Sequence, residues 1–216
     1  MLIGVHYPKA GGSSVGTALT EAYGPTLLRD YDEAPPRVDS PVTFDPVGYF
    51  ARDFTIPHGI ECVYGHLHIN KYRRIRNARR FVMLRHPVDA LISTYFYFQS
   101  VSDNVGGVLL QHIKKNKLTV LEMARIPTYT HLMSRTYFGG VDMSCFDVIG
   151  RHDRRDVFFT SLSALAERPI SPDHRVNVTP RYDERSEMLD DPQLLSRLTD
   201  ILRDDVRFYE RHAYRD

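Results

Sequence analysis

A lysine, two glycines and two serines stand together near the start of the chain, in the stretch HYPKAGGSSV at residues 6–15. An apolar run at 2–7 precedes this stretch, and apolar residues from Val15 to Ala22 recur at helical spacing after it. A glycine turn between a strand and a helix exposes backbone N–H groups, and the helix N-terminus adds partial positive charge. We therefore expect a phosphate-binding loop made of Lys9, Ala10, Gly11, Gly12, Ser13 and Ser14.

The order of residues in this loop differs from that of the usual nucleoside-triphosphate loop. In the pattern GxxxxGK[ST], the lysine follows the second glycine and the next hydroxyl residue binds magnesium. Here Lys9 precedes both glycines, so it would lie at the entrance of the loop, beside the outermost group of a bound nucleotide. The alternative is a plain tight turn whose polar residues are merely solvated.

A second phosphate-binding pair is expected in LRHPVDALISTYFYF, residues 84–98. Arg85 ends an apolar run, and Ser93 lies two turns into the helix that the following proline predicts. If that helix bends back over the sheet edge, an arginine fork and a hydroxyl can bind one phosphate together. The alternatives are a surface ion pair for Arg85 and a helix serine bonded to its own backbone for Ser93.

Both stretches resemble motifs of sulfotransferases that use 3′-phosphoadenosine 5′-phosphosulfate (PAPS). PKAGGSS is similar to their 5′-phosphosulfate loop, PKTGGTS-like, with Ala10 and Ser13 where threonine is frequent. LRHPVDALISTYFYF is similar to their 3′-phosphate motif LRdPvdRliSxyyy, although His86 and Ala90 replace an Asp and an Arg. None of these exchanges removes a phosphate ligand. The resemblance implies PAPS as cofactor, with 3′-phosphoadenosine 5′-phosphate (PAP) as product.

Further similarities extend along the chain. DVIGRHDR at 147–154 looks like the family's FDFIGRxE segment, and HRVNV at 174–178 and the pair Asp205 and Tyr209 also look like family features. The resemblance also implies that Asn177 and Arg181 close over the adenosine side. The remaining segments, about 25–58 and 100–140, are expected to be variable insertions on the acceptor side.

A histidine follows a predicted strand in YGHLHINKY, residues 64–72. The segment resembles the HGHV-type segment of heparan sulfate and uronyl 2-O-sulfotransferases, and His66 falls on the catalytic histidine of that group. An imidazole suits a general base at neutral pH. His68 is a second candidate, and the acids after the first helix remain a third. Those acids are Asp30, Asp32 and Glu33.

The resemblance implies direct transfer of a sulfuryl group to a hydroxyl of a carbohydrate, such as a bacterial capsule or other surface polysaccharide. Transfer needs a base, in-line positioning and neutralisation of the leaving phosphate. His66 would be the base and Lys9 would neutralise the charge, so no metal is expected. The alternatives are a nucleotide kinase or NTPase of related fold, a non-catalytic nucleotide- or glycan-binding module, and a small-molecule acceptor.

A basic run lies between the candidate base and Arg85. Seven lysines and arginines fall within residues 71–85, and no acid occurs from 62 to 88. Such a run fits an anionic acceptor or the cofactor. The alternative is a solvated helix face paired with the acidic C-terminal segment. Nucleic-acid binding fits poorly, because the net charge is +1 and no recognised motif is present.

The elements that must position these residues alternate between strand and helix over 216 residues. We expect strands at 2–7, 61–65, 80–84 and 145–149, helices at 87–99, 153–166 and 191–212, and helical pieces within 46–52 and 105–138. Residues 25–58 and 168–184 are expected to be mostly loop. This order predicts one α/β domain, a P-loop-like three-layer fold with a mostly parallel sheet.

Composition narrows the class of protein further. The two cysteines predict neither a disulfide framework nor a zinc site, and the ten histidines form no HExxH motif. No apolar run reaches the roughly 18 residues of a membrane span, and the N-terminus has no signal-peptide pattern. We expect a cytoplasmic protein. The oligomeric state is left open.

Overall fold

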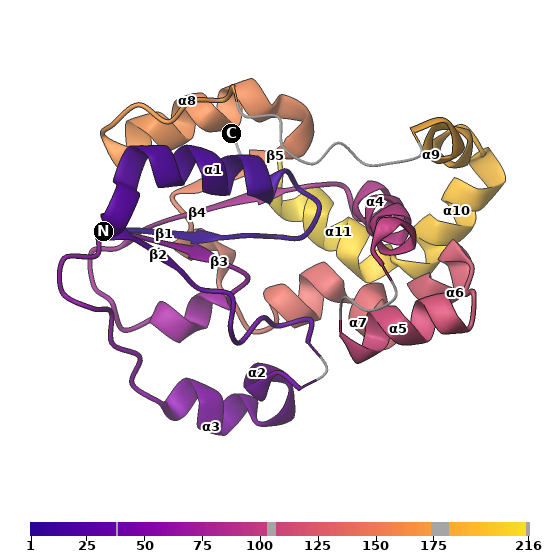
Figure 1. The fold of residues 1–216 in the computed structure, drawn as a ribbon, viewed down its shortest axis with the longest axis horizontal. Helices are drawn as coiled ribbons and strands as arrows, with labels where there is room; N and C mark the ends of the chain where they lie inside the picture. The colour runs from indigo at the N-terminus through magenta and orange to yellow at the C-terminus, as the bar shows by residue number, and fades with distance from the viewer. Residues whose placement is uncertain (38, 103–106, 174–181, 215–216) are drawn as a thin grey trace.

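A five-stranded sheet forms the centre of the protein, in a computed structural model that describes residues 1–37, 39–102, 107–173 and 182–214 (Figure 1). The strand order is β2-β3-β1-β4-β5, and every neighbouring pair runs parallel. The predicted α/β class with a mostly parallel sheet is confirmed.

The strands are short, and β1 lies at the middle of the sheet. Their bounds are β1 Leu2–Val5, β2 Leu27–Arg29, β3 Cys62–Gly65, β4 Arg79–Leu84 and β5 Val148–Arg151. In the parallel register, Val5 lies beside Gly65 of β3 and Val82 of β4. The residues that follow β1, β3 and β4 therefore leave the sheet at the same edge.

Helices and helical turns make up most of the rest of the described chain. Their bounds are α1 Gly12–Tyr23, η1 Gly24–Thr26, α2 Pro41–Phe44, α3 Pro46–Ala51, η2 Ile69–Tyr72, α4 Pro87–Ser100, α5 Val108–Lys115, α6 Val120–Ala124, α7 Pro127–Thr130, the π-helix η3 Leu132–Tyr137, η4 Met143–Cys145, η5 His152–Arg154, α8 Arg155–Ala166, α9 Tyr182–Leu189, α10 Pro192–Ile201 and α11 Arg203–His212. Within the parts of the chain that the structure describes, no helix is both long and apolar enough to cross a membrane.

Helices cover both faces of the sheet, which gives three layers (Figure 1). The alternation of side chains along a strand decides which face each residue serves. Leu2 packs with residues of α1 and α8 on one face. Ile3 and Val5 pack on the other face with residues of α4, α10 and α11. Because both faces are covered, the strands carry continuous apolar runs, as parallel sheets do.

Two expectations about the elements are wrong, and one strand was not expected. Residues 25–58 hold the helical piece expected within 46–52, which is α3, but β2 also forms there and pairs with β3. The segment before residue 191 is not loop up to 184, since α9 begins at residue 182. The single helix expected over 191–212 is two helices, with Leu202 at φ −93° and ψ 18° between them. Each error involves a short element that tertiary contacts stabilise against weak local signals.

The fourth predicted strand is present but shifted. It was expected at 145–149 and to end at Gly150, and β5 runs instead from Val148 to Arg151. Cys145 belongs to η4, and the Asp147 backbone N–H donates to the Arg80 carbonyl at 2.8 Å. Pairing with β4 therefore sets the position of this strand.

Asp205, the acid of the pair Asp205 and Tyr209, forms hydrogen bonds that hold the fold together. Asp205 is 1% exposed, and its carboxylate accepts bonds from the Met133 N–H at 2.7 Å and the Ser134 N–H at 2.8 Å. The Ser134 hydroxyl also donates to it. Asp205 thus joins α11 to the start of η3, where backbone donors would otherwise be unpaired.

Asp205→Ala is expected to lower the free energy of unfolding by about 3 kcal/mol, because it leaves buried donors unsatisfied. Asp204→Ala is the matched control, since the neighbouring Asp204 side chain is 44% exposed and its ion pairs are long, at 3.6 and 3.7 Å. Urea unfolding of the two variants measures the difference. Equal stability of the variants would show that the Asp205 bonds contribute little.

Candidate functional site

The loop between β1 and α1 has the backbone of an anion-binding turn. Lys9 and Gly11 both take positive φ, at 57° and 81°. A left-handed conformation is uncommon for a residue with a Cβ, and such strain clusters at functional sites. Gly11 caps α1 without a side-chain hydrogen bond, and the first turn of the helix holds no acid. The positive end of the helix is therefore open to an anion.

Three cations converge on this loop. The Arg85 guanidinium donates to the Lys9 carbonyl at 2.9 Å and so fixes the strained residue. Burial, and then repulsion from Arg85 and Arg185, lowers the pKa of Lys9 to about 8. Burial and Arg185 likewise lower the pKa of Arg85 to about 10. Positive groups that destabilise one another in this way form a site that an anion would stabilise.

Both arginines hold a buried donor without an acceptor. Arg85 Nε and Arg185 Nε are each shielded from solvent and make no hydrogen bond to a described atom. A buried unsatisfied donor is costly, so native proteins leave one mainly where a ligand or ion satisfies it. The two guanidinium groups and Lys9 are therefore well suited to polyanionic phosphate or sulfate groups.

The other sequence-predicted ligands in the described chain lie in the helices that follow β1 and β4. Ser13 and Ser14 are in the first turn of α1, and Ser14 is 2% exposed. Ser93 lies in the second turn of α4 and is fully buried, whereas Arg85 contacts the loop directly. Asn177 and Arg181 lie outside the described residues.

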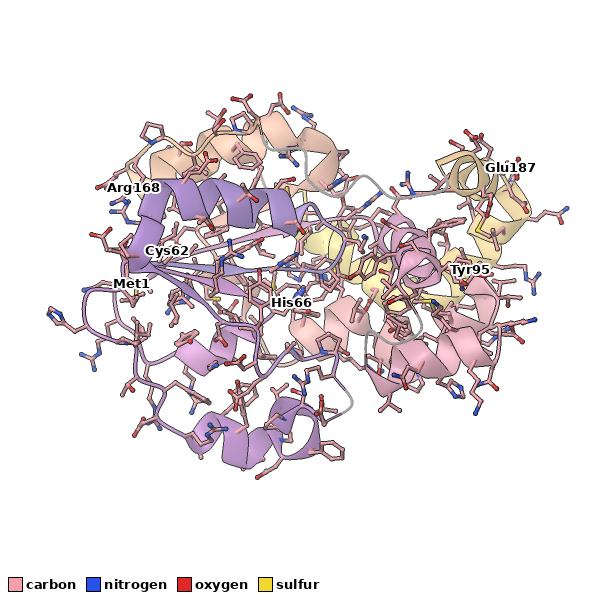
Figure 2. All side chains as sticks on the ribbon, in the orientation of Figure 1. Met1, Cys62, His66, Tyr95, Arg168 and Glu187 are labelled. Carbon is pink, nitrogen blue, oxygen red and sulfur yellow. The ribbon has the colours of Figure 1, made fainter. Side chains whose placement is uncertain are left out.

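The candidate base His66 directly follows β3 (Figure 2). His66 Nδ1 lies 2.6 Å from the His6 carbonyl and 3.0 Å from the Tyr137 hydroxyl. A carbonyl can only accept, so Nδ1 carries the proton and Nε2 keeps its lone pair. Nε2 makes no hydrogen bond to a described residue. Burial lowers the pKa of His66, so the ring is neutral at pH 7, as a general base requires.

His68 is held in a different way from His66. Its Nδ1 accepts from the Asn70 N–H, and its Nε2 lies 3.2 Å from the Gly139 carbonyl. It is 3% exposed and caps η2, with the Phe50 ring at 4.8 Å. Both ring nitrogens are occupied by backbone groups, so His68 has a structural role here.

Two of the three carboxylate candidates, Asp30 and Glu33, are also engaged. Asp30 contacts the Lys71 ammonium at 2.8 Å and accepts from the Tyr72 hydroxyl at the same distance. Glu33 contacts Lys71 at 3.3 Å, and the Lys71 and Arg52 cations outweigh burial and lower the pKa of Glu33. Asp32 is exposed. Asp30 and Glu33 tie the segment after β2 to η2.

Three of the seven cations of the basic run pair with acids from other segments of the described chain. Lys71 pairs with Asp30, Arg74 with Asp53, and Arg79 with Glu167. The pairing with the acidic C-terminal segment that the sequence suggested is wrong for these residues, because the partners come from other segments. The Arg74 and Arg79 pairs are exposed, and such pairs contribute little to stability, whereas the Lys71–Asp30 pair is largely buried.

A close approach explains the glycine at the start of α1. A Cβ on Gly12 would lie 1.9 Å from Cδ2 and 2.1 Å from Nε2 of His6, whereas one on Gly16 would meet Tyr64 at an ordinary 3.5 Å. Gly12→Ala is expected to lower the free energy of unfolding by about 2 kcal/mol. Gly16→Ala, the matched control, is expected to be neutral or up to about 1 kcal/mol stabilising. Urea unfolding compares the two, and equal effects would contradict this contact.

Sequence reasoning missed several residues of the site. Arg185 lay between the loop expected at 168–184 and the helix expected from 191, and its basic charge among acids was the one available signal. His152 and Arg155 lie near Gly11, since a Cβ there would be 3.3 and 3.5 Å from them. Burial and Arg85 lower the pKa of His152 to about 4. No local pattern brings these residues to the loop, because β5 does so through its pairing.

A cluster of aromatic rings surrounding His66 was also missed. The His6 ring stacks on His66 with centroids 4.1 Å apart, and Tyr31 and Tyr137 approach His66 edge-on at 5.2 and 6.3 Å. These rings shield the imidazole from water. Among the described residues, no three histidine, cysteine or acidic side chains gather as a metal-binding group.

Comparison with known proteins gives a structural similarity but no match in sequence. No family model matches the chain, and no curated protein matches it in sequence. The crystal structure of a sulfotransferase from Alicyclobacillus acidocaldarius aligns with a TM-score of 0.46 and 17% sequence identity, over 100% of this chain and 96% of the other.

Proposed function

We propose that the protein is a sulfotransferase that moves a sulfuryl group from PAPS to a hydroxyl of a carbohydrate acceptor. One observation carries the proposal. Lys9, Arg85 and Arg185 converge on a glycine loop, and a neutral imidazole with a free Nε2 lone pair stands at the end of the strand next to it in the sheet. Cations for a polyanionic donor and a base for a hydroxyl are what this reaction requires.

The proposed reaction is a direct in-line displacement. The acceptor oxygen attacks sulfur, the bond from sulfur to the 5′-phosphate oxygen breaks, and the phosphate leaves with the electron pair. His66 Nε2 takes the proton of the attacking hydroxyl. Lys9 and the backbone N–H groups from Gly11 to Ser14 stabilise the charge that grows on the leaving phosphate. Positioning and electrostatics supply the catalysis.

The assignment of cofactor groups follows from the same residues. Lys9, Ala10, Gly11, Gly12, Ser13 and Ser14 would hold the 5′-phosphosulfate. Arg85, joined by Ser93 and Arg185, would hold the 3′-phosphate, since two guanidinium groups with unused donors suit a dianion. Asn177 and Arg181 would close over the adenosine. No resident metal enters this scheme.

The remaining assignments concern the acceptor and its setting. Acceptor specificity would come from the segments 25–58 and 100–140, within a single domain spanning 1–216. A capsule or other surface polysaccharide made in the cytoplasm is the proposed setting, and nucleic acid is not a proposed partner. The main rival is a nucleotide kinase or NTPase, which Lys9 placed before the glycines disfavours.

Two labelled donors test the proposal. The protein is incubated with PAPS carrying radioactive sulfur, or with ATP carrying a radioactive terminal phosphate and magnesium, and with a panel of polysaccharides or water alone. We expect PAP release from PAPS, faster with the right acceptor, and no phosphate transfer from ATP. Transfer from ATP, with none from PAPS, would establish the rival reaction. Tight PAP binding without transfer to any acceptor would indicate a binding module.

A further inference from the structure

His6 is a second imidazole at the site. It follows β1 and lies between two rings, with the His66 centroid at 4.1 Å and the Tyr64 centroid at 5.5 Å, both nearly parallel to it. Its Cδ2–Nε2 edge faces the first residue of α1, because a Cβ on Gly12 would fall within 2.1 Å of both atoms. His6 thus joins the base to the anion-binding loop.

The two stacked rings make different hydrogen bonds at Nδ1. His66 Nδ1 is protonated, because it lies 2.6 Å from a carbonyl. His6 Nδ1 lies 2.9 Å from the Tyr31 hydroxyl, which can donate to it or accept from it. The edge with Nε2 faces a loop built for an anion, and a lone pair there would repel the ligand. The tautomer of His6 that suits a bound anion is therefore the one with its proton on Nε2 and with Tyr31 donating to Nδ1.

We propose that His6 Nε2–H donates a hydrogen bond to an oxygen of the transferred sulfuryl group, while His66 Nε2 accepts the proton of the acceptor. This inference rests on the proposed function. The atoms balance as before: the bond from sulfur to the leaving phosphate oxygen breaks and the bond from sulfur to the acceptor oxygen forms. The acceptor proton moves to His66, and His6 keeps its own proton throughout.

Two features divide the roles between the stacked rings. In this tautomer the Tyr31 hydroxyl donates to the lone pair of His6 Nδ1, 2.9 Å away, so His6 is a poor base. Two stacked imidazolium rings at 4.1 Å would repel each other strongly, so only one can be charged after proton transfer. Burial, together with His66 and Lys9, holds the pKa of His6 well below its usual value. His6 therefore remains a neutral donor beside the ring that becomes charged.

His6→Phe is the sharpest variant, since phenylalanine keeps a flat ring in the stack and removes the N–H. We expect PAP release from PAPS to water or acceptor to fall about 100-fold, the loss typical of one transition-state donor. PAP affinity, measured by calorimetry, is expected to stay close to that of the wild type. A His6→Phe rate equal to that of the wild type would overturn the proposal and leave His6 a packing residue.

Nitrogen NMR of the wild-type protein gives an independent readout. Long-range nitrogen–proton correlations distinguish the tautomers, and we expect Nε2–H for His6 and Nδ1–H for His66. In Tyr31→Phe we expect His6 to lose its preference for the Nε2–H tautomer, while His66 keeps its own tautomer. Nδ1–H on His6 in the presence of PAP would also overturn the proposal. If the wild-type protein released no PAP from PAPS, the proposed function itself would fail, whereas an active wild type with an unaffected His6→Phe variant refutes the role of His6 only.

Discussion

Lys9→Met is expected to lower the rate of PAP release from PAPS by about 100- to 1,000-fold, because the leaving phosphate loses the cation that stabilises its growing charge. The side chain is poised for this role, with its ammonium 4.5 Å from the Tyr97 ring centre and its carbonyl held by Arg85. Lys115→Met is the matched control, since Lys115 is exposed on α5. Initial rates at saturating PAPS measure the effect, and an unchanged rate for Lys9→Met would remove the lysine from the chemistry.

The same lysine predicts a pH dependence. Its pKa is lowered to about 8 in the free protein, so the cation is present below that pH and is lost above it. The specificity constant kcat/KM for PAPS should therefore fall as the pH rises through about 8. Lys9→Arg should shift this alkaline limb to higher pH, because the guanidinium stays charged. An alkaline limb that is unchanged in Lys9→Arg would assign it to another group.

His66→Ala is expected to lower transfer by about 100- to 10,000-fold, the usual range for a lost general base. PAP affinity should stay near that of the wild type, because His66 makes no contact with Lys9, Arg85 or Arg185 among the described residues. His58→Ala is the matched control, since His58 is exposed. Transfer kinetics and PAP calorimetry on both variants separate catalysis from binding. A His66→Ala enzyme with near-normal transfer would rule out His66 as the base.

His66 also sets the acid limb of the profile. Burial lowers its pKa below 6.5, so the ring is neutral and active at pH 7 and becomes protonated as the pH falls through that lowered value. Together with Lys9, this predicts a bell-shaped kcat/KM profile with its plateau between the two pKa values. Loss of the acid limb in His66→Ala, on its residual activity, is the expected signature.

The central architecture could be predicted from local sequence. Apolar runs at 2–7 and 80–84, and the glycine turn before Val15, mark β1, β4 and α1 clearly. β2 could not be found in this way, because two half-buried leucines and an exposed arginine carry no periodic signal and pair only with β3. The break at Leu202 also escaped prediction, since the apolar spacing continues across it.

The site shows the same division. Lys9, Arg85 and His66 stand in motifs or at strand ends, so their residue types and positions indicated a role. His6 and Arg185 owe their roles to contacts in the folded protein. His6 stacks on His66, which is 60 residues away in sequence, and Arg185 lies in α9, which packs on α4. Local spacing cannot encode such contacts, and buried donors without acceptors become visible only in the folded protein.

Calorimetric titration with PAP, beside adenosine 5′-phosphate and ATP with magnesium, tests the central claim most directly. We expect micromolar binding of PAP, with adenosine 5′-phosphate and ATP at least about 10-fold weaker, a difference of about 1.4 kcal/mol. Arg85→Ala and Arg185→Ala should each abolish that preference, while the exposed-site control Lys115→Met keeps it. Equal binding of PAP and adenosine 5′-phosphate by the wild type would contradict a 3′-phosphate site and, with it, the assignment of PAPS as the donor.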